Sequence, residues 1–210
     1  MKITAKQGKG TKIHIHIDGE YLLTVDEDFW FSSGYVSGDE IDDGDLAAFK
    51  EAAGSRLAFN SAMFSLDMRD HSEREIRQKL ARKYDEQSVD SAVFKLLDLG
   101  LVNDRRYAEQ LCRELFERKK FGKSRVVSEL YRKGISREII NEVLDEYEEE
   151  NEPDNVQRIV DIIRKKYYNK LIDEKSRQKT VAALVRLGYS FSDIRQAMSE
   201  FSSDEFYEEY

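Results

Sequence analysis

Apolar and polar residues alternate near the start of the chain, over residues 13–17. Such alternation is typical of a half-buried β-strand, and the next dipeptide, Asp18-Gly19, tolerates the positive φ of a tight turn. The pattern therefore predicts a β-hairpin over residues 11–25. After a turn-rich connection, a short helix is predicted around 45–54. This leader has few large apolar residues, so we expect it to pack against the helices after it.

From about residue 56 the apolar positions follow helical spacing, and one stripe of this kind occurs three times. The stripes lie 51 and then 54 residues apart: Val89, Ala92, Val93 and Leu96; Ile140, Val143, Leu144 and Tyr147; Ile194, Ala197, Met198 and Phe201. Each stripe follows a basic helix that ends in a turn, and each such pair follows a further helical segment, around 57–69, 104–119 and 154–168. This periodicity predicts three copies of a three-helix unit.

Local signals mark where these helices begin and end. Ser72 and Glu75 fit a capping box at a helix start in copy one. In copies two and three a serine precedes the third helix, and a glycine suited to a left-handed residue ends the second: Ser136 and Ser190, Gly134 and Gly188. Copy one lacks this glycine and is one residue shorter at the turn. The only proline, Pro153, lies between copies two and three and suggests a hinge.

These patterns predict a mostly α fold with three tandem three-helix repeats, each similar to a helix-turn-helix, in an elongated and curved array. A unit of about 50 residues buries a small fraction of its surface, so neighbouring copies should stack. A small N-terminal extension contains the β-hairpin. The predicted divisions are the extension at 1–55, repeats at 56–102, 103–152 and 153–201, and an acidic tail at 202–210.

Charge is distributed in blocks that the overall sum conceals. The 210 residues carry 34 lysines and arginines against 42 aspartates and glutamates, a net charge of −8. Residues 105–133 nevertheless hold ten basic side chains and four acidic ones, whereas residues 134–154 hold one arginine and nine acids. A local basic block can bind phosphates on a chain that is acidic overall. The simpler interpretation, that each block is a solvated helix face, stays open.

The composition also bears on where the protein acts. No uncharged apolar stretch approaches the roughly 20 residues that cross a bilayer, and the first ten residues lack an apolar signal core. A single cysteine, Cys112, cannot form an internal disulfide. We therefore expect a cytoplasmic protein that does not bind membranes. No long heptad pattern is present, which favours a monomer.

An enzyme finds little support in the sequence. There is no Gly-x-x-x-x-Gly-Lys-Ser/Thr loop for phosphates. His14 and His16 share one face of the predicted strand but lack the further ligands of a metal site. Cys112 lies in an apolar helix, and His71, just ahead of a helix start, is predicted to lie at the surface. We expect no catalytic residue, no metal and no cofactor.

Four motifs carry a resemblance to a known family: Ser72-Glu-Arg-Glu-Ile-Arg-Gln-Lys-Leu80, Leu101-Val-Asn-Asp-Arg-Arg-Tyr-Ala108, Leu130-Tyr-Arg-Lys-Gly-Ile-Ser136 and Leu187-Gly-Tyr-Ser-Phe-Ser-Asp-Ile194. In this order and spacing, over roughly residues 57–201, the chain resembles RecX, the bacterial regulator of the RecA recombinase. The resemblance implies a non-enzymatic protein that lies along the groove of the RecA–DNA filament. It also implies that the protein inhibits RecA in recombination, DNA repair and the SOS response.

The residues expected to contact DNA phosphates or an acidic face of the partner are basic: Arg113, Arg118, Lys119, Lys120, Lys123, Arg125, Arg132 and Lys133, followed by Lys165, Lys166, Arg177 and Lys179. Phosphate contacts would bind single- or double-stranded DNA without sequence preference. An alternative is a stand-alone helix-turn-helix DNA-binding protein or transcription regulator, which would select one duplex sequence. A third is an adaptor that binds only protein.

Overall fold

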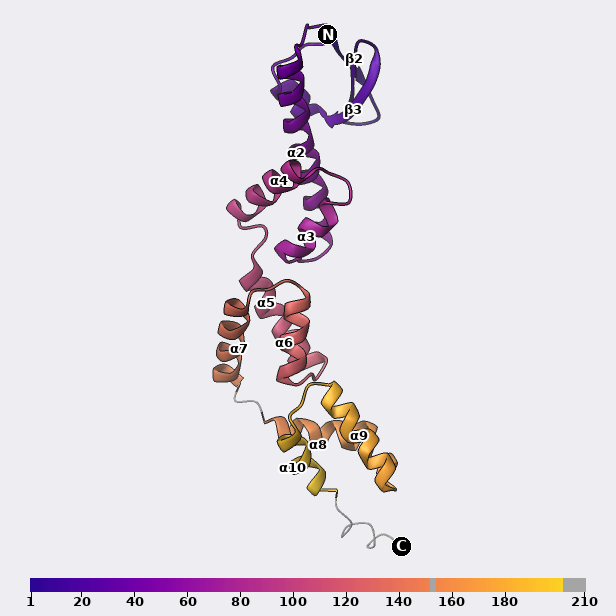
Figure 1. Cartoon of the computed structure of the whole chain (residues 1–210), viewed down its shortest axis with the longest axis vertical. Helices are drawn as coiled ribbons and strands as arrows, with labels where there is room; N and C mark the ends of the chain where they lie inside the picture. The colour runs from indigo at the N-terminus through magenta and orange to yellow at the C-terminus, as the bar shows by residue number, and fades with distance from the viewer. Residues whose placement is uncertain (152–153, 202–210) are drawn as a thin grey trace. The chain divides into compact units, whose positions relative to one another are not determined.

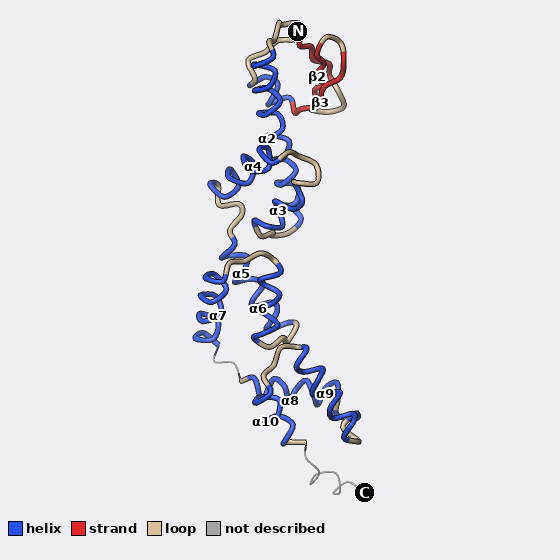
Figure 2. The backbone as a smooth tube through the Cα atoms, in the orientation of Figure 1, coloured by secondary structure: helices blue, strands red, loops and turns tan. Residues whose placement is uncertain are grey.

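The structure is a computed structural model that describes residues 1–151 and 154–201. Its contacts divide the chain into two units, Met1–Asn103 and Asp104–Tyr210, and each is described by itself. Within the described residues the buried apolar side chains form one core beside the N-terminal sheet and one core in each three-helix copy. Helices account for most of the described residues, and strands occur near the N-terminus (Figures 1 and 2).

The first unit opens with an antiparallel sheet in the order β1 (Ile3–Gln7), β2 (Lys12–Ile17) and β3 (Glu20–Asp26). β2 and β3 form the predicted hairpin, and Asp18 and Gly19 at its turn have φ values of 49° and 89°. β1, which was not predicted, pairs with β2. The leader is therefore a three-stranded sheet rather than an isolated hairpin.

The strand register gathers apolar side chains on one face of the sheet. Ile13 lies opposite Val25, and both are buried. A short helix, α1 (Glu27–Ser32), follows β3 directly because the Asp26 carboxylate accepts the Phe29 N–H at 2.8 Å and caps the helix. The buried face of the sheet packs against this helix and against the next one, α2 (Asp43–Met68).

α2 is one helix of 26 residues where two were predicted, around 45–54 and 57–69, so the predicted break was wrong. Gly54, near the expected break, costs a helix about 1 kcal/mol relative to alanine but does not end it. Its physical role is close packing, since a Cβ at this position would lie 2.4 Å from the Ser88 hydroxyl oxygen. The glycine thus marks a helix contact rather than a helix end.

The two halves of α2 belong to different cores. Leu46, Phe49 and Ala53 pack against the sheet, whereas Ala58 and Ala62 belong to the core of copy one. The expected division between residues 55 and 56 falls inside this helix, which joins the extension to copy one as Figure 1 shows. The first half of α2 thus supplies the apolar surface against which the few large side chains of the N-terminal extension pack.

Copy one continues with α3 (Glu73–Leu80) and α4 (Glu86–Asp98). The predicted capping box is confirmed at the start of α3. His71 was expected at the surface, and that prediction was wrong, because its side chain is buried. The imidazole Nδ1 lies 2.8 Å from the Arg69 carbonyl oxygen and Nε2 lies 2.8 Å from Lys79 Nζ. These partners satisfy the ring inside the copy.

The second unit begins with copy two, which contains α5 (Asp104–Arg113), the π-helical turn η1 (Glu114–Arg118), α6 (Lys123–Arg132) and α7 (Arg137–Asn151). The segment predicted as one helix over 104–119 thus ends in a wider turn.

Copy three contains α8 (Asn155–Lys166), the 3-10 turn η2 (Tyr168–Lys170), α9 (Glu174–Arg186) and α10 (Phe191–Ser199). Gly134 and Gly188 have φ values of 88° and 95°, as predicted for helix ends. The hydroxyls of Ser136 and Ser190 accept backbone N–H groups at the starts of α7 and α10, also as predicted.

The predicted fold class is confirmed: a mostly helical chain with three three-helix copies and a small N-terminal sheet. The elongated, curved array stays a prediction. Pro153 and the acidic tail at 202–210 lie outside the described residues. None of the helices within 1–151 and 154–201 has the length and apolar character that a bilayer crossing requires.

Candidate nucleic-acid and partner interface

The basic block of copy two lies on α5, η1 and α6. In α6 the apolar side chains of Val126 and Leu130, four residues apart, are fully buried. The helical repeat then turns Lys123, Arg125 and Arg132 outward, and all three are exposed. The same apolar spacing that builds the core of copy two therefore produces its charged surface.

Part of this block is neutralised by α7, the helix that holds most of the acidic stretch at 134–154. The pairs are Arg105 with Glu142 and Glu146 at 2.6 and 2.5 Å, Arg113 with Glu150 at 2.9 Å, and Lys123 with Glu148 at 2.8 Å. α5 and α7 lie side by side, so charges far apart in sequence meet in space (Figure 1). Exposed pairs of this kind contribute little stability, but they reduce the local positive field.

Further arginines pair with acids of their own helical segment. Arg118 bonds Glu114 within η1, and Arg125 and Arg132 both contact Glu129, the former at 2.8 Å. Glu129 is 9% exposed, so the two guanidinium groups supply the counter-charge that a buried carboxylate requires. Because these arginines already have carboxylate partners, they are weaker candidates for an external ligand than sequence alone indicates.

Lys119 and Lys120 differ from the rest of the block. Both are exposed, and neither forms an ion pair with any residue that the structure describes. Lys120 has a φ of 56°, the left-handed conformation that reverses the chain after η1. This turn thus carries two exposed ammonium groups without a carboxylate partner among the described residues. Lys133, also expected as a contact, is half-buried and has an internal partner.

The same turn forms the contact between copies two and three. The Gly122 N–H donates to the Leu187 carbonyl at 2.8 Å, and the Ser124 hydroxyl donates to the Gly188 carbonyl at 2.9 Å. A Cβ on Gly122 would lie 2.3 Å from the Gly188 carbonyl oxygen, and one on Gly188 would lie 2.4 Å from the Arg125 backbone nitrogen. The two turns approach this closely because both positions are glycine. This contact agrees with the expectation that neighbouring copies stack.

Tyr189 adds a side-chain link across the same contact. Its hydroxyl donates to the Lys120 carbonyl at 2.9 Å, and burial raises the pKa of the phenol to about 12. The lysine turn is therefore held from copy three by a donor that stays protonated near neutral pH. Sequence reasoning missed Gly122 and Tyr189 as positioning residues, although the matched Gly-Tyr dipeptide at 188–189 offered a signal.

In copy three the predicted contact residues divide in the same way. Lys165, Lys166 and Lys179 are exposed and have no ion-pair partner in the described part of the chain. Arg177 is half-buried and donates to the Phe201 carbonyl at 2.7 Å. It therefore stabilises the end of the copy and is a weaker candidate for filament contact.

The remaining candidates for chemistry show no arrangement suited to catalysis. Cys112 is fully buried, and this burial raises the pKa of its thiol to about 12, so the nucleophilic thiolate does not form near neutral pH. His14 and His16 both contact the Tyr21 ring, and His14 bonds the Thr24 hydroxyl at 2.7 Å. No cluster of three or more metal-ligating side chains occurs among residues 1–151 and 154–201.

Comparison with protein families finds three matching models along the chain. They are described as the first, second and third three-helix domains of RecX, and they match residues 58–96, 103–144 and 152–198 respectively. Each match falls on one of the three helical copies. Together they cover more than half of the sequence.

Individual proteins show the same similarity. The regulatory protein RecX of Listeria welshimeri is 31% identical over 209 residues, which are 98% of this chain and 77% of that protein. The regulatory protein RecX of Clostridioides difficile is 24% identical over 201 residues, 95% of this chain and 93% of that protein.

Two crystal structures share the fold. A regulatory protein RecX aligns with a TM-score of 0.69 at 23% identity, covering 94% of this chain and 97% of that one. RecX from Lactobacillus salivarius aligns with a TM-score of 0.60 at 24% identity, covering 71% and 97%.

Proposed function

Because the chain belongs to the RecX family of regulatory proteins, we propose that it binds the RecA–DNA filament and inhibits RecA recombinase activity in recombination, DNA repair and the SOS response. It does so by binding, not by catalysis. It acts in the cytoplasm and as a monomer.

One observation carries the proposal: five of the lysines expected as contacts are exposed and have no ion-pair partner within the described residues. They are Lys119, Lys120, Lys165, Lys166 and Lys179. An ammonium group already paired in the fold must give up that partner before it binds a phosphate, whereas these five lose only water and counterions. Among the residues expected to contact the filament, they are the best available ligands for its DNA phosphates.

Lysine is a flexible point charge without the planar fork that reads a guanine edge. Contacts through lysine therefore attach the protein to DNA without reading the sequence, as binding along a filament requires. Each phosphate neutralised on single-stranded DNA should steepen the salt dependence, adding about 0.7 to the slope of log affinity against log salt. Attachment should weaken steeply as salt increases.

Charge reversal at the lysine turn should weaken inhibition. The double variant Lys119→Glu/Lys120→Glu should need at least about tenfold more protein to inhibit RecA on single-stranded DNA, because repulsion replaces two phosphate contacts. RecA-coupled ATP hydrolysis and filament length at several salt concentrations measure the effect. The salt slope should fall by about 1.4, the contribution of two phosphates.

A matched control keeps the change of net charge and moves it elsewhere. Lys6→Glu/Lys9→Glu places the same reversal on two exposed lysines of the N-terminal sheet region. This control should inhibit like the unchanged chain. Equal loss in both variants would show that net charge, not the lysine turn, matters. If the unchanged chain altered neither ATP hydrolysis nor filament length, the proposed function itself would be wrong.

A stand-alone transcription regulator is less well supported by the structure. In a helix-turn-helix the second helix of the pair enters the major groove. In copy two this helix is α7, and its outward side chains are largely acidic: Glu138, Glu142, Asp145, Glu146 and Glu149 are all exposed. Such a surface repels phosphates. Strong selection of one duplex sequence over random duplex would nevertheless favour this alternative.

A further inference from the structure

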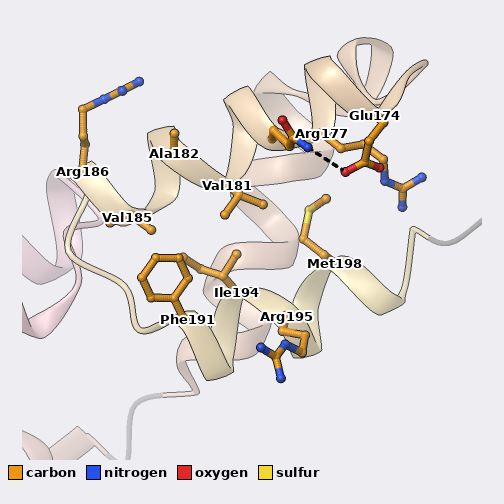
Figure 3. A pocket seen from close by; sticks show the side chains of 11 residues that line it. Glu174, Arg177, Val181, Ala182, Val185, Arg186, Phe191, Ile194, Arg195 and Met198 are labelled. Carbon is orange, nitrogen blue, oxygen red and sulfur yellow. Dashed lines mark hydrogen bonds between the residues drawn. The ribbon is translucent and has the colours of Figure 1, made fainter.

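An apolar groove of about 660 Å³ lies between α9 and α10 in copy three. Figure 3 shows Val181 and Val185 of α9 facing Phe191, Ile194 and Met198 of α10 across it. Phe191 is 65% exposed, so its ring is accessible to an occupant of the groove. The floor of the groove is thus apolar and reaches solvent.

Arginines border this apolar floor. Arg177 and Arg186 lie toward opposite ends of α9, and Arg195 lies on α10 (Figure 3). Neither Arg186 nor Arg195 forms an ion pair with any residue that the structure describes. The one acid in the lining, Glu174, accepts the Gln178 amide at 3.3 Å. An occupant should therefore combine apolar side chains with negative charge.

The groove of copy three differs in chemistry from that of copy one, so it is not a necessary consequence of the repeat. The corresponding groove of copy one is lined by Arg77, Glu86 and Asp90, among others. There Arg77 pairs with Asp90 across the two helices. In a repeat of this fold, an ion pair between the two helices can therefore stand where copy three has apolar side chains.

The chain itself carries a segment of the required composition next to the groove. The acidic tail, residues 202–210, reads Ser-Ser-Asp-Glu-Phe-Tyr-Glu-Glu-Tyr, with three aromatic and four acidic residues. It continues from Phe201, whose carbonyl oxygen accepts a hydrogen bond from Arg177, a lining residue. The tail therefore starts at one end of the groove.

Length permits the tail to reach along the groove. Nine residues can span up to about 30 Å when extended. The α9 segment from Arg177 to Arg186 is about 14 Å long, at about 1.5 Å per residue. We propose that the groove between α9 and α10 is the docking site of the acidic tail, with the aromatic side chains on the apolar floor and the carboxylates beside the arginines.

Attachment to the same chain favours this occupant. A short flexible connection gives an effective concentration in the millimolar range, so a weak contact suffices to fill the groove. A partner segment of similar composition would have to displace the tail. None of the lysines proposed to bind the filament lines this groove.

The experiment compares the full chain with a chain ending at Phe201. A fluorescently labelled peptide of residues 202–210 is titrated into each, and polarisation reports binding. The shortened chain should bind the peptide saturably, and the full chain should bind it at least about tenfold more weakly because its own tail occupies the site. Absence of binding to the shortened chain, with its circular dichroism unchanged, would overturn the proposal.

Substitutions in the shortened chain locate the site. Phe191→Ser and Arg195→Glu alter exposed residues of the lining, and each should weaken peptide binding about fivefold or more. Lys175→Glu reverses an exposed charge on α9 outside the lining and should leave binding within about twofold. Equal binding to the full and shortened chains, or no difference among these variants, would show that the tail does not fill this groove.

Discussion

Copies one and three build the same groove from opposite chemistry. Leu80 and Leu184, buried in the second helices, are 104 residues apart, and Val89 and Ile194, in the third helices, are 105 apart. The difference is the one residue by which the turn of copy one is shorter. In this register Arg77 corresponds to Val181, Ala81 to Val185, Glu86 to Phe191 and Asp90 to Arg195.

The buried stripe and the groove face of a repeat are therefore independent of one another. Both copies keep apolar residues at the stripe, because without them the three helices share no core. The groove is lined by an ion pair in copy one and by exposed apolar side chains in copy three. The fold alone does not explain the apolar groove, which is why we assign it a ligand.

The turns of the two copies differ as well. Copy three carries Gly188, through which it contacts copy two, whereas copy one has no glycine at its shorter turn. The largest effect is expected from Gly188→Val. A β-branched residue at a φ of 95°, with its Cβ 2.4 Å from the Arg125 nitrogen, should destabilise copy three by about 3 kcal/mol or more.

Hydrogen exchange measured by mass spectrometry reports the stability of each copy separately in the Gly188→Val variant. Peptides from α9 and α10 should lose protection in Gly188→Val. Lys83→Val, at the exposed turn of copy one, should leave protection of α3 and α4 nearly unchanged. Equal effects in both turns would contradict the assignment of the copy contact to glycine.

A smaller effect is expected in the pH dependence of stability, which should differ between copy one and copy three. Burial, together with the nearby charges of Arg69 and Lys79, lowers the pKa of His71, whereas the hydrogen bond to the Arg69 carbonyl and the charge of Glu75 act in the opposite direction. Below the ordinary histidine pKa, near 6.5, the unfolded chain takes up a proton that folded copy one resists. Stability should thus be complete above that pH and fall as the pH drops through the lowered value.

The measurement is hydrogen exchange of copy one at pH 7.5 and pH 5.5, corrected for intrinsic rates. Copy one should lose protection at the lower pH, whereas copy three, which contains no histidine, should not respond in this way. His71→Gln should flatten the response of copy one. A response of equal size in that variant would contradict the role given to the imidazole.

The smallest effect is expected when the groove residues of copy three are transferred to copy one. Arg77→Val/Glu86→Phe/Asp90→Arg gives copy one the apolar and basic residues of copy three. In a chain that ends at Phe201 and carries Phe191→Ser and Arg195→Glu, it should restore tail-peptide binding with a Kd of about 1 mM, or roughly −4 kcal/mol. Polarisation of the labelled peptide measures it. Failure to bind would mean that groove shape matters beyond these three positions.

Helix existence and capping were predictable because their signals are local. The capping box at Ser72 and the helix end at Gly188 depend on residues only a few positions away, so a short stretch of sequence suffices to predict them. β1 was missed because its pairing depends on β2, several residues away. The break expected near Gly54 was wrong because that glycine serves a contact with Ser88, on another helix.

The ion pairs of the candidate interface also depend on residues far apart in sequence, and local patterns did not reveal them. Composition identified the basic block but could not show that Arg113 and Lys123 face Glu150 and Glu148. These partners are 37 and 25 residues away in sequence. Charge pairing across helices depends on how the helices pack, and packing is a property of the assembled copy.

The three-helix repeat, its caps and the charge of each block can be read from the amino-acid sequence, since they follow from periodicities and short-range bonds. Packing of the helices is needed to show which charges are neutralised, which glycines join copies two and three, and which groove reaches solvent as an apolar surface. The two kinds of feature differ in the distance along the chain over which they act. Helix signals act over a few residues, whereas ion pairs, close backbone approaches and grooves arise where segments tens of residues apart meet.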